Sequence, residues 1–314
     1  MISRPTIRRP SVPTGGGGLY FSSPKKGLDF IPTGCVVLDC VLGGGWPLGR
    51  IVNVVGDKST GKTLLAMEAI ANFFLKYDNG RSWYNEAEAA FDVDYAKALG
   101  IPMERVEKLE SYDTVEAVVE HLEGVLERIK GPGLYILDSL DALSDEAEMG
   151  RGIRDSSYGA SKAKKMSELF RRLVRKVKQK QICVMIISQV RDNIGVTFGE
   201  KHGRSGGKAL DFYASQVLWL AHIKTLKQKR ATVERPIGIL IRAKCKKNKV
   251  GLPFRECQFN IRFGYGVEDT EASEEFLREI GADVPEEPAA LRQAVVKEWY
   301  AIEKRFIPEK RKYG

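Results

Sequence analysis

The sequence lacks several features that define large classes of protein. No apolar run reaches the roughly 18 residues that a membrane-spanning helix needs. Residues 1–18 carry positive charge, but no apolar segment follows them, so we expect no secretory signal there. Apolar residues make up 43% of the chain and charged residues 29%. This is the composition of an ordinary globular protein, not of a disordered chain or a coiled coil.

Cysteine and histidine are too few and too scattered to indicate a metal site. The five cysteines form no C-x-x-C pair and the chain has only three histidines, so we expect no zinc site. Cys183 lies inside an apolar run and is interpreted as a buried packing residue. We therefore expect a reducing, intracellular setting.

Acidic residues are outnumbered, and the excess of basic residues is unevenly placed. The net charge is +9, which moderately favours a polyanionic partner. Residues 1–26 hold five Lys or Arg and no acid, and residues 162–180 hold nine against the single acid Glu168. For 162–180 a solvated helix face is the simpler interpretation. Residues 268–287 are acidic.

Short apolar strands alternate with amphipathic helices over residues 31–268. This pattern predicts an α/β core with a mainly parallel sheet and helices on both faces. Residues 1–30, rich in Pro, Gly and Ser, are predicted to be a flexible basic arm, which could pair with a neighbouring chain through Leu19, Tyr20 and Phe21. Residues 269–314 are predicted to be a small helical extension with a basic tail. Strands are expected at 51–55, 82–85, 134–137, 182–187, 215–220, 237–242 and 257–263, and helices at 62–77, 114–130, 160–180, 271–280 and 288–305.

A phosphate-binding pattern lies between the strand 51–55 and the helix 62–77. Its sequence, GDKSTGKT, fits G-x-x-x-x-G-K-[ST], and the strand before it and the helix after it are the context that this loop requires. The glycines let backbone N–H groups face the phosphates, and the helix N-terminus adds partial positive charge. We expect Lys62 to reach the β- and γ-phosphates of ATP, and Thr63 to place its hydroxyl on Mg²⁺. The loop consists of Gly56, Asp57, Lys58, Ser59, Thr60, Gly61, Lys62 and Thr63.

A carboxylate follows the apolar strand 134–137. Asp138 is expected at the carboxyl end of a buried strand beside the phosphate loop. A carboxylate in that position can hold Mg²⁺ through its water shell. Together with the loop, Asp138 predicts a site for ATP and Mg²⁺.

Longer stretches of the sequence resemble the RecA family of DNA recombinases, in its bacterial and phage branch. The opening stretch is IPTGCVVLDCVLGGGWPLGRIVNVVGDKSTGKT. The resemblance implies a RecA-type core that uses ATP and Mg²⁺, hydrolyses ATP to ADP and phosphate in a DNA-dependent way, and forms a helical filament of many copies. The filament would coat single-stranded DNA and pair it with homologous duplex DNA in recombination and repair. The similar stretches are 31–63, 85–101, 136–143, 188–199, 205–215 and 246–254.

The resemblance also implies roles within the subunit for residues outside the phosphate loop. Glu88 matches the acid that polarises the attacking water, although the residues alone do not separate it from Glu86, which strand alternation puts on the same side. Asp92 and Tyr95 match contacts to adenine, where Tyr95 would otherwise be interpreted as a core aromatic. Gln189 matches the residue that senses the γ-phosphate and relays its state to the DNA loop.

Two lysines are implied to act across a subunit boundary. Lys247 and Lys249 match a pair that reaches the ATP of the neighbouring subunit, where their charge would act like an arginine finger. From the residues alone this segment would be interpreted as a solvated turn.

Two polar, glycine-punctuated stretches match the paired DNA loops of the family. They span 145–160 and 190–209, and a loop of the second length implies function or disorder. Cations and glycine N–H groups suit phosphates, and apolar side chains suit gaps between bases. In the first stretch the expected contacts are Arg151, Arg154 and Tyr158. In the second they are Arg191, Ile194, Val196, Phe198, Lys201, Arg204, Gly206, Gly207 and Lys208.

The ends of the chain depart from the family pattern. Residues 1–30 do not resemble the N-terminal helix by which family members dock on a neighbour, and the larger C-terminal domain is missing. The compact form suggests a phage-type or otherwise reduced recombinase, in the cytoplasm of a bacterium or, for a phage-encoded protein, of its host. Two alternatives stay open: a hexameric helicase or translocase of the same fold, and a nucleotide-gated DNA-binding accessory protein.

Overall fold

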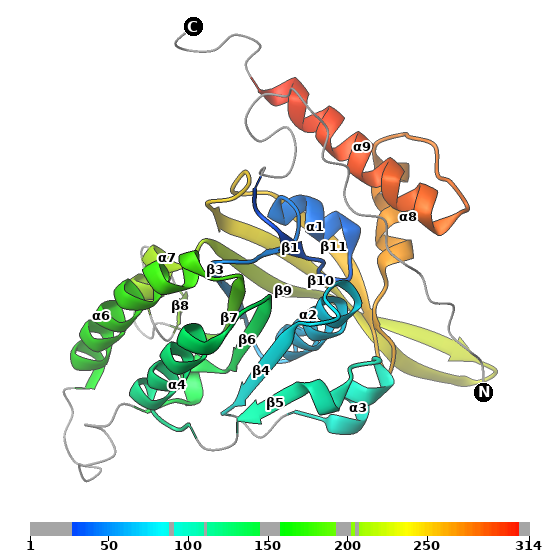
Figure 1. The fold of residues 1–314 in the computed structure, drawn as a ribbon. Coiled ribbons are helices and arrows are strands. Elements are labelled where there is room, and N and C mark those ends of the chain that lie inside the picture. The colour runs from blue at the N-terminus through cyan, green and yellow to red at the C-terminus, as the bar shows by residue number, and fades with distance from the viewer. Residues whose placement is uncertain are drawn as a thin grey trace, which may run out of the picture.

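One large mixed sheet forms the centre of the fold (Figure 1). The structure, a computed structural model, describes residues 27–87, 91–109, 112–144, 158–192, 202–204 and 207–307. The strand order is β12-β11-β10-β9-β3-β7-β6-β4-β5, with β8 paired to β7. Neighbours from β9 to β5 are parallel, which confirms the predicted mainly parallel sheet. These strands are β9 (Gln216–Arg230), β3 (Arg50–Gly56), β7 (Ile182–Asp192), β6 (Gly133–Asp138), β4 (Arg81–Glu86) and β5 (Val106–Leu109).

Antiparallel strands complete the other side of the sheet. Here β9 and β10 form a long hairpin that projects from the body of the molecule (Figure 1). The predicted strands 215–220 and 237–242 were too short, because residues 222–236 are exposed on both faces and so carry no alternating apolar pattern. The remaining strands are β10 (Val233–Asn248), β11 (Glu256–Arg262), β12 (Gly266–Val267), β8 (His202–Arg204) and a separate pair, β1 (Phe30–Ile31) and β2 (Trp46–Pro47).

Helices cover both faces of the sheet, as predicted. Alternate residues of β3 point to opposite sides, so Val52 and Val54 enter one apolar core and Ile51 and Val55 the other. The first core is covered by α1 (Val36–Leu42), α2 (Lys62–Lys76), α3 (Val93–Ala98), α8 (Asp269–Glu279) and α9 (Pro288–Phe306). The second is covered by α4 (Val115–Arg128), α6 (Tyr158–Gln179) and α7 (Gly207–Tyr213). Two short 3₁₀ turns are η1 (Met103–Arg105) and η2 (Leu140–Ala142).

The basic helix α6 packs one face on the sheet and pairs part of the other with α4. Phe170 and Leu173 are buried in the second core. Arg172 and Lys176 both lie beside Glu123 of α4, with nitrogen–oxygen distances of 2.8 and 3.2 Å. These ion pairs support the interpretation of a largely solvated, charge-paired face.

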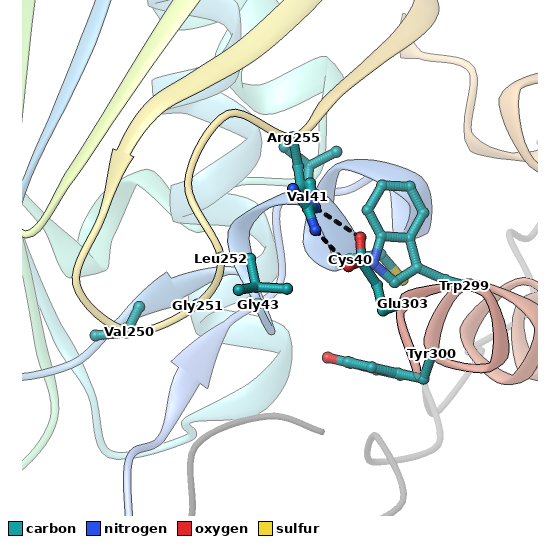
Figure 2. Close-up of a pocket in the computed structure, with 10 residues that line it drawn as sticks. All are labelled: Cys40, Val41, Gly43, Val250, Gly251, Leu252, Arg255, Trp299, Tyr300 and Glu303. Carbon is teal, nitrogen blue, oxygen red and sulfur yellow. Dashed lines mark hydrogen bonds and ion pairs between the residues drawn. The ribbon is translucent and has the colours of Figure 1, made fainter. Parts of the chain in front are cut away.

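The C-terminal helices α8 and α9 share the first apolar core with α1. Leu277, Leu291 and Val295 are buried in that core. The guanidinium of Arg255, in the segment between β10 and β11, binds both carboxylate oxygens of Glu303 on α9, at 2.7 and 2.6 Å (Figure 2). Bidentate pairs of this kind fix orientation as well as adding energy. The helices that follow the core are therefore anchored to it.

The five cysteines of the chain are packing residues. All five cysteines are free and buried, so Cys183 is the packing residue that the sequence indicated. Burial raises the pKa of each thiol, that of Cys245 to about 12.

Among the described residues no helix has the length and apolar character to cross a membrane. Of the predicted arm, residues 1–26 lie outside the described part of the chain.

Candidate active site

The phosphate-loop segment joins the end of β3 to the start of α2. Gly61 has φ of 81° and Ser59 has φ of 57°, so the backbone turns through the left-handed region twice. A side chain at Gly61 would place its Cβ 2.3 Å from Cδ1 of Ile261, and one at Gly56 would lie 2.4 Å from Oγ1 of Thr60. Gly61 is therefore required by space and by backbone conformation, and Gly56 by space.

Lys62 lies over the loop that precedes it. Its side chain is buried, and its ammonium donates a hydrogen bond to the carbonyl of Asp57 at 2.7 Å. The hydroxyl of Thr60 donates to the same carbonyl at 2.8 Å. Because the N-cap of α2 is Gly61, no capping side chain covers the N–H groups that begin the helix. An ammonium and uncapped N–H groups at one helix end favour an anion.

Asp138 ends β6 and lies directly beside the start of α2. Its Oδ2 accepts a hydrogen bond from the hydroxyl of Thr63 at 2.7 Å, and another from the hydroxyl of Tyr84 at 2.7 Å. Asp138 is 5% exposed and Tyr84 1%. A hydroxyl and a carboxylate side by side are the hard oxygen donors that suit Mg²⁺, so the residues present fit this ion.

Gln189 lies next to the loop on the neighbouring strand. It pairs in register with Gly56, and its backbone N–H donates to Oδ2 of Asp141 at 2.7 Å. The sequence predicted Gln189 just past the end of a strand, but β7 continues to Asp192 and pairs with β8. The base of the predicted second DNA loop is thus a short β-ladder that begins one residue after Gln189.

Lys247 and Lys249 lie at the other edge of the sheet. Backbone bonds place them there: the Lys249 N–H donates to the carbonyl of Ser215, and the Ser215 N–H donates to the carbonyl of Ile51 at the start of β3. The ammonium of Lys247 donates to the carbonyls of Asp211 and Phe212, the second at 2.8 Å, and that of Lys249 donates to Phe212 at 3.1 Å. Both lysines therefore bind the C-terminal carbonyls of α7. The simple solvated-turn interpretation omitted these contacts.

Similarity to known proteins identifies the family of the chain. The sequence model of the RecA N-terminal domain matches residues 18–268. The chain belongs to the RecA family. It is similar to Protein RecA of Clavibacter michiganensis (38% identical, covering 83% of this chain and 72% of the relative). It is also similar to Protein RecA of Streptomyces avermitilis, at 36% identity over 82% of this chain and 68% of the relative.

A third relative is matched over a smaller share of its length. Protein RecA of Prochlorococcus marinus (strain NATL1A) is 37% identical over 77% of this chain, and the match spans only 62% of that relative. All three relatives are bacterial, so they give no support to the phage-type interpretation.

The candidates near the end of β4 are only partly described. Glu86 pairs in register with Asp138, and its Oε1 accepts a hydrogen bond from the N–H of Phe91. The Glu86 carboxylate therefore links the end of β4 to Phe91. Glu88 lies outside the described residues, so its choice over Glu86 stays a prediction.

The predicted adenine contacts lie on α3. Asp92 is the N-cap of this helix, and its Oδ1 accepts from Asp94 N–H at 3.0 Å and Tyr95 N–H at 2.9 Å. Tyr95 is half-buried against the first core, where burial and then the charge of Glu68 on α2 raise its pKa. These positions place α3 beside the phosphate-loop helix, and a capping role for Asp92 had not been foreseen.

Most of the predicted DNA contacts lie outside the described residues. Backbone is described at 158, 191, 204, 207 and 208, but not the positions of their side chains. The predicted contacts that lie wholly outside the described residues are Arg151, Arg154, Ile194, Val196, Phe198, Lys201 and Gly206.

Two residues at the site were missed from the sequence. Tyr84 was available as an aromatic two positions before Glu86, but nothing local distinguishes it from a core residue. Ile261 of β11 packs against Gly61 through a contact between strands distant in sequence. The pocket of Figure 2, lined by Gly43, Arg255 and Tyr300 among others, lies beside the turn that carries Lys249 and not at the phosphate loop.

Proposed function

We propose that this chain is an ATP-dependent DNA recombinase that assembles on single-stranded DNA, pairs it with homologous duplex DNA and hydrolyses ATP at boundaries between subunits. The observation that carries the proposal is the separation of two sets of phosphate-binding groups. Lys62, Thr63 and Asp138 lie at the carboxyl edge of the parallel strands, whereas Lys247 and Lys249 lie at the amino edge.

The separation is too large for one subunit to combine both sets. Lys247 of β10 pairs with Val217 of β9, and Gly56 of β3 pairs with Leu220 of β9. Along β9 the positions of Lys247 and Gly56 therefore differ by three residues, or about 10 Å at the rise of a strand. The lysine ammoniums also point to α7, which covers the second core, while the phosphate loop opens α2 over the first. A role for these lysines in ATP hydrolysis therefore requires another copy of the chain.

An exposed aromatic beside the lysines supports contact with such a copy. Phe212 is 69% exposed at the end of α7, and the ammonium of Lys249 lies 5.9 Å from the centre of its ring. Exposed aromatics next to cations are common anchors of protein interfaces. The ATP of one subunit would then lie against α7 and the lysines of the next.

Within the subunit, each group has a chemical task. Lys62 and the uncapped N–H groups of α2 would bind the phosphates, and Thr63 and Asp138 would hold Mg²⁺ with its waters. That ion, when bound, offsets negative charge on the phosphates. Glu88 would accept a proton from the attacking water, and Lys247 and Lys249 of the neighbour would stabilise charge on the γ-phosphate.

Gln189 would connect ATP to DNA. It lies in register with Gly56 of the phosphate loop, one residue before the ladder that closes the predicted second DNA loop. A contact between the Gln189 side-chain amide and the γ-phosphate would shift the adjacent backbone, and with it the β7–β8 ladder. The cations of both predicted loops would bind the DNA phosphates.

The proposal is tested by ATPase and strand-exchange assays with single-stranded DNA. Lys62→Ala should abolish hydrolysis, because the ammonium that offsets phosphate charge is removed. Lys58→Ala, which removes an exposed cation from the same loop, is a control for charge. Electron microscopy with a non-hydrolysable ATP analogue should show open helical filaments. Closed rings, or near-normal turnover by Lys62→Ala, would contradict the proposal.

A further inference from the structure

Tyr84 makes a contact that the proposed mechanism does not otherwise use. Its side chain is buried on β4, and its hydroxyl donates to Oδ2 of Asp138 at 2.7 Å. The hydroxyl of Thr63 donates to the same oxygen at the same distance. One carboxylate oxygen thus receives two hydroxyl donors, from α2 and from β4.

We propose that Tyr84 is a positioning residue that holds the Asp138 carboxylate in the orientation needed to bind the hydrated Mg²⁺ of MgATP. This inference rests on the proposed function and adds to it a residue and a measurable property. A carboxylate that binds a metal through water does so by directional hydrogen bonds. Both its orientation and its charge therefore affect the affinity for the metal. Side chains that orient such groups commonly affect metal affinity or activity 10–100-fold when they are changed.

Burial shields the orientation of the Asp138 carboxylate from solvent. Asp138 is 5% exposed, so bulk water cannot readily replace a donor that is lost. The hydroxyl oxygen of Thr63 would also serve as a ligand of Mg²⁺, whereas Tyr84 has no expected role at the ion and lies in a strand of the sheet. Of the two hydroxyls, that of Tyr84 is therefore the one that can hold the carboxylate before and after the ion binds.

The surroundings of Tyr84 fix it on both sides. Its ring lies 4.5 Å from that of Phe91, whose N–H donates to Glu86. The backbone N–H of Ala87 donates to the carbonyl of Asp138 at 2.8 Å, which ties the ends of β4 and β6 together. The same tyrosine thus lies between Asp138 and Phe91.

The test removes only the hydroxyl. Tyr84→Phe keeps the ring against Phe91, and Tyr135→Phe is the matched control, because Tyr135 is equally buried on β6 but faces the second core, with its hydroxyl 3.3 Å from Nδ1 of His121. Binding of a fluorescent ATP analogue is followed during a Mg²⁺ titration. Electron paramagnetic resonance of Mn²⁺ then measures metal binding without turnover.

Tyr84→Phe should raise the half-saturating Mg²⁺ concentration about tenfold and leave binding without Mg²⁺ unchanged. Excess Mg²⁺ should restore analogue binding and turnover. Tyr135→Phe should titrate like the wild type.

A Tyr84→Phe titration that matches wild type would overturn the inference, as would a loss of binding that excess Mg²⁺ does not restore. Wild-type protein without Mg²⁺-dependent analogue binding would instead refute the proposed function, and the inference with it. The two failures are therefore distinguishable.

Discussion

Removing Lys247 and Lys249 together tests whether ATP is hydrolysed between subunits. In the double variant Lys247→Ala, Lys249→Ala, the phosphate loop is untouched, but the C-terminal carbonyls of α7 lose both ammonium donors. A cation at an exposed helix C-terminus contributes about 0.3–1 kcal/mol. We therefore expect the double change to lower the free energy of unfolding by about 1 kcal/mol, and Tm by about 2–4 °C.

The expected loss of activity is far larger than this loss of stability. A charge supplied from a neighbour to a γ-phosphate changes turnover by about 10³-fold or more, which corresponds to about 4 kcal/mol of activation barrier. A protein with about 5–15 kcal/mol of stability remains almost fully folded after losing 1 kcal/mol. Unfolding therefore cannot account for a thousandfold fall in ATPase activity.

Mixing experiments separate an effect at the boundary from one within the subunit. The double variant is combined with an excess of Lys62→Ala protein, and ATPase activity is measured with saturating single-stranded DNA. At a mixed boundary an intact phosphate loop faces intact lysines, so activity should partly return. Lys244→Ala with Lys246→Ala is the matched control, because it also removes two charges from β10, where Lys244 pairs with Glu256 and Lys246 lies over the ring of Trp219. Full activity of the double variant would refute the proposed role of the two lysines at the ATP of a neighbouring subunit. A mixture that recovers no activity would also refute it.

Two further predictions concern the acids Glu88 and Asp29. Glu88→Gln should bind ATP but hydrolyse it slowly in an ATPase assay; the same phenotype from Glu86→Gln, with Glu88→Gln active, would show that the residues were assigned wrongly. At Asp29, burial raises the pKa, but hydrogen bonds from Lys76 and Tyr77 and the charge of Lys76 outweigh it and lower the pKa below its usual value. The carboxylate therefore contributes stability above its ordinary pKa, which is lost as pH falls through the lowered value. Asp29→Asn should destabilise by less than about 1 kcal/mol at pH 7, since the pair is partly exposed, and the difference in urea midpoint should shrink as the pH falls through the lowered pKa; a pH-independent difference would contradict this.

The positions of residues at the ends of regular strands and helices were predicted correctly from the sequence, while their roles stay predictions. The phosphate loop is one example, since a strand, two glycines and a helix start within a few residues are sufficient to define it. Asp138 is another, because a buried parallel strand places its last residue at a known edge of the sheet. The predicted strands and helices follow from the same cause: burial of one or both faces imposes a period on the apolar residues.

Contacts between distant segments left no such local signal. Tyr84 has the side chain of an ordinary core aromatic, and only the pairing of β4 with β6 brings it to Asp138. The apolar pattern of Ile261 predicts a strand but not its contact with Gly61. The exposed hairpin of β9 and β10 was shortened in the prediction because a ribbon without a buried face needs no alternation.

The arrangement of the sheet makes ATP hydrolysis depend on assembly under the proposed function. A parallel sheet has two chemically different edges, and this chain places the phosphate loop at one and the lysine pair at the other. No side-chain movement joins them within a subunit, because the sheet lies between. Under that proposal, a copy that presents its amino edge and α7 to the next copy's phosphate loop would complete one site and leave its own loop open for another copy. Such head-to-tail contacts would propagate, so a geometry that withholds hydrolysis from a monomer would also favour a polymer.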